Sequence, residues 1–150
     1  MQSKNILFSS IVETSAMTLF SYLISESENK NFREPEVLAR LIKRLPGSSS
    51  EETAQIAGWG MHYTIGFLFV VIYSELWKQK NIDPAVTSGI LLGTASGLTG
   101  ILAWKAMFEI HPDPPVKDLK DYFRHLLLAH VVFGVFSALA FKLLSEEENS

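Results

Sequence analysis

Residues 84–104 read PAVTSGILLGTASGLTGILAW, and this uninterrupted apolar segment decides the fold. It contains no Asp, Glu, Lys or Arg over 21 residues, about the length that an α-helix needs to cross the hydrocarbon core of a bilayer. Its leucines and isoleucines are distributed all around the helix, whereas a soluble bundle helix would carry charges opposite an apolar stripe. The segment therefore predicts a transmembrane helix.

Three further segments have the same character. Residues 54–74 and 126–141 also lack Asp, Glu, Lys and Arg, and residues 6–25 are interrupted only by Glu13. We expect residues 1–150 to form a single integral membrane domain, an all-α four-helix transmembrane bundle whose surroundings are the lipid bilayer. A soluble four-helix bundle with an unusually apolar core is the weaker alternative. The predicted spans are residues 6–25, 54–77, 84–110 and 121–144.

A short amphipathic helix is predicted between the first and second spans. Residues 35–45 begin with Pro35, which suits the first turn of a helix, and their apolar side chains lie opposite Arg40. Two positions are open for this helix, one on the membrane surface and one packed on the protein's own loop. Ser49 and Glu52 have the spacing of a capping box and predict the start of the second span.

Composition excludes several classes of function. The chain has no cysteine, which excludes disulfides, thiolate metal sites and cysteine nucleophiles. Its net charge of −3 gives no support to a nucleic-acid partner. The two longer connecting segments carry about eight Lys and Arg residues against about four on the other side. This bias predicts that the longer loops are cytoplasmic and that both termini lie outside.

The second and fourth spans resemble each other. His62-x-x-x-Gly66 is followed by Tyr73, and His130-x-x-x-Gly134 is followed by Phe141, so an aromatic residue lies eleven positions after each histidine. These two spans must also cross the membrane in the same direction. Two tandem two-helix units related by duplication would explain the similarity, and a chance match between apolar helices is the alternative.

Glycines in the third span have a strict four-residue spacing. Gly89, Gly93 and Gly97 lie on one face, where small residues let helix backbones approach closely in lipid. Gly66 and Gly134 on other spans are candidate partners. The row of glycines predicts helix packing, either inside the bundle or against another protein.

All four histidines fall in the half of the bilayer that adjoins the longer loops: His62, His111, His125 and His130. His62 and His130 at similar depth are candidates to bind haem, a metal or a quinone, because ionisable residues within a membrane often mark a site. His125 and His130 are five residues apart and point about 140° away from each other, so they cannot chelate one metal together. Hydrogen bonding between helices is the simpler interpretation, and we predict no cofactor or metal site.

Glu13 is a single acidic residue near the middle of the first span. It is a candidate proton or ion site. Alternatively it is a neutral carboxyl hydrogen-bonded to Thr14 or to a hydroxyl of the third span, or it pairs with a partner subunit.

Several of these motifs together resemble small uncharacterised bacterial inner-membrane proteins of the YagU-like kind. The resemblance implies a four-span protein of the bacterial inner membrane, and it implies no activity. The motifs that carry it are His62-x-x-x-Gly66 with Tyr73, the glycine-rich third span, His111-Pro112, and Ala129-His130 with Gly134.

No nucleophile–base pair or phosphate-binding loop is visible, so we expect no enzyme activity. The predicted function is a non-catalytic accessory or structural subunit of a larger membrane complex, or a homo-oligomer. One alternative is a haem-, metal- or quinone-binding protein that uses His62 and His130. Another is an oligomeric proton or small-solute channel that involves Glu13.

Overall fold

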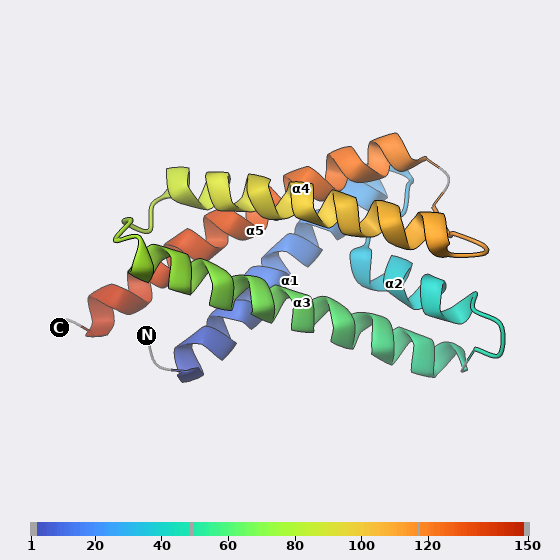
Figure 1. The fold of residues 1–150 in the computed structure, drawn as a ribbon, viewed down its shortest axis with the longest axis horizontal. Helices are drawn as coiled ribbons and strands as arrows, with labels where there is room; N and C mark the ends of the chain where they lie inside the picture. Colours follow the sequence, from blue (N-terminus) through green and yellow to red (C-terminus); the bar gives the residue numbers. More distant parts are fainter. Residues whose placement is uncertain (1–2, 49, 117, 149–150) are drawn as a thin grey trace.

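The computed structural model describes residues 3–48, 50–116 and 118–148, which form five helices (Figure 1). Four of them are long and apolar enough to cross a membrane, so the predicted all-α fold with four spans is confirmed. The ends of these spans differ from the predicted ends by three residues or fewer. The helices are α1 (Ser3–Glu28), α2 (Glu34–Lys43), α3 (Glu51–Gln79), α4 (Val86–Ile110) and α5 (Leu119–Glu148).

Two helix starts differ from the expected residues. The N-cap of α3 is Ser50, whose hydroxyl accepts a hydrogen bond from the backbone N–H of Thr53 at 3.2 Å. The predicted capping box used Ser49, which lies outside the described residues. Helix α4 begins at Val86 rather than at Pro84, because the residue preceding the helix still has an extended backbone.

The four long helices form the predicted bundle, which is open along one side. Helix α5 packs between α4 and α1, α1 packs on α3, and α3 packs on α2. Among the four long helices the packing order is α4, α5, α1, α3, so the consecutive helices α3 and α4 stand at opposite ends of an open arc and have few contacts with each other. Both termini lie at one end of the molecule, and the loop between α4 and α5 lies at the other end, near α2 (Figure 1).

Helices α3 and α4 are joined by side chains near their short connection. The hydroxyls of Tyr73 and Ser96 share a hydrogen bond at 2.5 Å, and the indole of Trp77 donates to Ser88 at 3.1 Å. Farther from this connection the two helices diverge, as the green and yellow-orange ribbons in Figure 1 show.

Glycines allow α4 and α5 to pack backbone against backbone. A Cβ atom added to Gly89 would overlap the carbonyl oxygen of Gly134, and one added to Gly93 would overlap the carbonyl oxygen of His130. A Cβ on Gly97 would lie 2.8 Å from the side chain of Leu127. The face that carries the glycine row is therefore occupied within the chain. Such contact provides the van der Waals attraction that holds helices together in lipid.

The short helix α2 packs on α3, whereas the two positions considered from the sequence were the membrane surface and the protein's own loop. Val37, Leu38 and Ala39 are almost completely buried, and the backbone of α2 lies directly against Gly58 of α3. Because Gly58 has no side chain, α2 can enter the open end of the arc between the spans. This position brings the first residue of α2, Glu34, into the interior.

Candidate functional site

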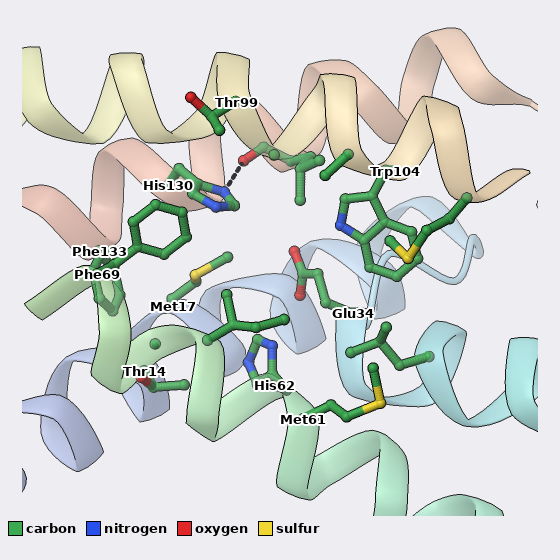
Figure 2. Close-up of a pocket in the computed structure, with 17 residues that line it drawn as sticks. Thr14, Met17, Glu34, Met61, His62, Phe69, Thr99, Trp104, His130 and Phe133 are labelled. Carbon is green, nitrogen blue, oxygen red and sulfur yellow. Dashed lines mark hydrogen bonds between the residues drawn. The ribbon is translucent and has the colours of Figure 1, made fainter. Parts of the chain in front are cut away.

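A cavity lies where α3 and α4 diverge. Its volume is ≈ 150 Å³, and side chains from all five helices line it. An apolar cavity of about that volume holds a single six-membered ring. Most of the lining is aliphatic or aromatic, and the polar exceptions include His62, His130 and Glu34. In Figure 2 these three side chains surround one open space, with Trp104 beside it.

His62 on α3 has one tautomer that its neighbours favour. Its Nε2 lies 2.9 Å from the hydroxyl of Thr18, and that hydroxyl donates its own hydrogen to the carbonyl oxygen of Thr14 at 2.6 Å. A hydroxyl has one hydrogen to donate, so Nε2 of His62 must be the donor in the first bond. Nδ1 is then the acceptor nitrogen of the ring.

His130 on α5 has the opposite tautomer, with its proton on Nδ1. Its Nδ1 donates to the carbonyl oxygen of Leu126 at 2.9 Å, which leaves Nε2 as the acceptor. A Cβ added to Gly100 of α4 would lie 3.3 Å from Nε2, so a larger residue at Gly100 would crowd this nitrogen. Phe69 packs edge-on against the ring, with 5.8 Å between centroids. The ring therefore has a defined orientation.

The His-x-x-x-Gly motif has the same structural role in α3 and α5. Gly66, four residues after His62, packs against Thr14 of the preceding span, and Gly134, four residues after His130, packs against Gly89 of its preceding span. Each glycine lets its helix approach the neighbour closely. Each histidine, one turn earlier, lines the same cavity. Two helices that run in the same direction thus each contribute one histidine to the wall of one cavity.

Glu34 is a site residue that sequence reasoning missed. It is 2 % exposed, Oε1 accepts a hydrogen bond from Ser21 at 3.2 Å, and Oε2 is buried without a hydrogen-bond partner. Burial raises the pKa of this carboxyl to about 7, although the bond from Ser21 acts in the opposite direction. An acidic residue in the first turn of a helix normally indicates a solvated end. No local signal distinguishes this one as buried.

The other two histidines do not line this cavity. His125 stacks between Phe20 and Phe32, with centroid distances of 5.5 and 4.6 Å, and lines a second cavity of ≈ 230 Å³. It thus points away from His130, as the five-residue spacing predicts. His111 caps the end of α4: its Nε2 donates to the carbonyl oxygen of Leu41 at 2.8 Å, and its Nδ1 accepts from the backbone of Asp113 at 3.1 Å.

Glu13 lies inside the bundle between α1 and α5. It is 1 % exposed, and its carboxylate accepts a short hydrogen bond from Ser137. The partners considered from the sequence were Thr14, hydroxyls of the third span and a partner subunit, and the hydrogen-bond partner in the structure is Ser137 on the fourth span. The sequence could not identify this contact because it depends on which helix packs beside α1.

Among the described residues, no three His, Asp or Glu side chains come close enough to share a metal ion. Comparisons with protein-family models, curated proteins and solved structures find no match to this chain. The cavity and the side chains that line it are therefore the features of the molecule that indicate its function.

Proposed function

We propose that this protein is a non-catalytic membrane protein that binds a lipid-soluble molecule, with a ring-sized polar head group held between His62 and His130. The observation that carries the proposal is that two histidines, from α3 and α5, line one ring-sized cavity and that each keeps one acceptor nitrogen. Because both nitrogens accept hydrogen bonds, the best ligand is a ring with two hydroxyl donors. A quinol meets this requirement.

An apolar groove supplies a place for the tail of such a ligand. It has a volume of ≈ 370 Å³ and shares Leu38, Met61 and Met107 with the cavity wall, so the two spaces adjoin. The groove lies between α2, α3 and α4, where the diverging helices leave an opening to lipid. A ligand dissolved in the bilayer would enter here without crossing water. The ring-sized volume favours a quinol over haem, because a porphyrin is much broader than one ring.

The test is a binding measurement with a short-chain hydroquinone in detergent or nanodiscs. Trp104 lines the cavity, so a bound quinol should quench its fluorescence. His62→Leu and His130→Leu should each weaken binding about two- to tenfold, the free-energy equivalent of one ordinary hydrogen bond. Thr64→Val is the matched control, since Thr64 is on α3 but exposed and bonded only to its own helix. Equal quenching in wild type and both histidine variants would refute the proposal.

The accessory-subunit function expected from the sequence remains a second proposal. The glycine row no longer supports it, because these glycines pack within the chain. What favours it is a pair of charged side chains on the outward face of α4: Lys105 and Glu109 lie 3.8 Å apart and are 59 % and 65 % exposed. Such a pair suits a polar patch on another membrane protein. Co-purification of a stoichiometric partner that is lost when both residues become leucine would support this function.

We further propose a bacterial inner-membrane location, with the longer loops cytoplasmic and both termini outside. The Lys and Arg bias of the loops and the resemblance to YagU-like proteins support it. A channel that uses Glu13 has less support. Because this side chain is buried within one chain, it would not line a pore between copies.

A further inference from the structure

Three polar side chains connect the two cavities described above. His125 Nε2 lies 2.9 Å from Ser21 Oγ, and Ser21 Oγ lies 3.2 Å from Glu34 Oε1. His125 lines the second cavity, and Glu34 lines the first. All three side chains are at least 96 % buried. The chain of hydrogen bonds therefore passes through the interior with no gap.

The two ends of this chain of hydrogen bonds have different surroundings. At the His125 end, the second cavity is also lined by the charged side chains of Glu28, Asp121 and Arg124, near the ends of α1 and α5 that adjoin the longer loops. This end therefore faces the aqueous side of the membrane. At the other end, the Glu34 carboxyl borders the apolar ligand cavity, and its Oε2 has no hydrogen-bond partner.

The titratable groups around Glu34 are few. From α5, His125 Nε2 lies 4.0 Å from Oε1, and Tyr122 interacts electrostatically with the carboxyl. His62 from α3 and His130 from α5 share the cavity wall with Glu34. Helix α1 contributes the neutral Ser21, and α4 contributes the neutral Trp104 to the cavity wall. No Lys or Arg side chain is among the residues that line the cavity, so the carboxylate has no fixed positive charge there.

We propose that Glu34 exchanges protons with the loop side of the membrane through His125 and Ser21, and that it thereby acts as a proton donor and acceptor at the ligand cavity. Its use by a bound ligand rests on the function proposed above. The exchange itself does not, since all three side chains are in place without a ligand.

Every proton that is gained or lost in this transfer is accounted for. In the starting arrangement, His125 Nε2–H donates to Ser21, and the Ser21 hydroxyl donates to the Glu34 carboxylate. A proton from water binds His125 Nδ1, the Nε2 proton moves to Ser21 Oγ, and the original hydroxyl proton moves to Glu34 Oε1. Glu34 is then neutral, and the neutral His125 ring carries its proton on Nδ1. The reverse sequence returns one proton to water.

The experiment follows the Glu34 carboxyl by time-resolved infrared spectroscopy after a pH step, using full-length, ligand-free protein in liposomes. The band of the protonated carboxyl is assigned by its loss in Glu34→Gln. Ser21→Ala and His125→Phe should slow the appearance of this band by about 100-fold, at the low end of what a positioned proton-transfer group contributes. Phenylalanine keeps the stack with Phe20 and Phe32, so the variant should retain the local packing.

Ser137→Ala is the matched control, because it removes the hydroxyl bonded to the other deeply buried carboxylate, Glu13. It should leave the Glu34 exchange rate unchanged. Unchanged rates in both Ser21→Ala and His125→Phe would overturn the proposal, since protons would then reach Glu34 by another route. Trp104 quenching by hydroquinone on the same samples tests the ligand function separately. A negative result in the infrared experiment therefore leaves the proposed ligand binding intact, and a negative quenching result leaves the proposed proton exchange intact.

Discussion

The backbone of Gly93 on α4 lies directly against the carbonyl oxygen of His130 on α5, with no room for a methyl group between them. Even the smallest side chain would press on backbone atoms, which cannot move aside like the end of a flexible side chain. This contact holds α5 close to α4, and it thereby positions the His130 ring at the wall of the cavity.

Gly93→Ala should therefore destabilise the protein by about 1–3 kcal/mol, the usual range for an overpacked interior. Unfolding in an SDS titration measures the change. Gly60→Ala is the control, because Gly60 is on a helix but has nothing within 4 Å of the added Cβ. Equal stability of the two variants would show that α4 and α5 are not packed as described.

Gly100→Leu should block the ligand site without disrupting a helix contact. The added Cβ would lie 3.3 Å from His130 Nε2, and the rest of the side chain would extend into the cavity. Saturable quenching of Trp104 by hydroquinone should disappear, while the helical circular dichroism signal and SDS stability stay close to wild type. Persistent quenching in this variant would place the quinol elsewhere.

The reduced form of the ligand should bind more tightly than the oxidised form. A quinol donates two hydrogen bonds to the two imidazole acceptors, whereas a quinone has only acceptors and would require the opposite tautomers of both histidines. Two bonds of about 1 kcal/mol each predict a preference of roughly tenfold or more for the quinol. Parallel titrations under reducing and oxidising conditions measure it, and equal affinities would contradict the assigned tautomers.

Stability should depend on pH through Glu34. Because burial raises the pKa of this carboxyl in the folded protein from 4.5 to about 7, the folded state binds more protons than the unfolded state between these values. The contribution of Glu34 to stability is then largest below pH 4.5 and falls as pH rises through about 7, by up to about 3 kcal/mol.

Glu34→Gln should remove this decrease and should be at least as stable as wild type at neutral pH, because the amide carries no charge to bury. Unfolding measured across that pH window checks the sign. A wild-type protein that gains stability with rising pH, or a Gln variant with the same slope, would mean that another group is responsible.

The absence of cysteine makes the membrane orientation directly testable. A single cysteine at Ser48, in the loop between α2 and α3, should be protected from a membrane-impermeant maleimide in intact cells. A cysteine at Asn81, between α3 and α4, should be labelled. The reverse pattern would place the longer loops outside and would invert the proposed topology.

Much of the fold followed from local sequence, whereas the site followed only in part. The histidine pair was recognisable because His62 and His130 share spacing and depth. The burial of Glu34 was not recognisable, because an acidic residue directly before Pro35 normally indicates the solvated start of a helix. The partner of Glu13 was equally inaccessible, since Ser137 lies 124 residues away in sequence.

The sequence by itself determined that this is an all-helical chain with four membrane spans, because crossing lipid requires long apolar helices whose backbone hydrogen bonds are internal. Tertiary structure alone decided that α3 and α4 diverge, that Gly58 admits α2 between them, and that a carboxyl group meets two imidazoles at one cavity. Helix pairing in lipid depends on backbone approach and side-chain shape across the whole chain. Hydropathy, which is a local property, carries no information about that pairing.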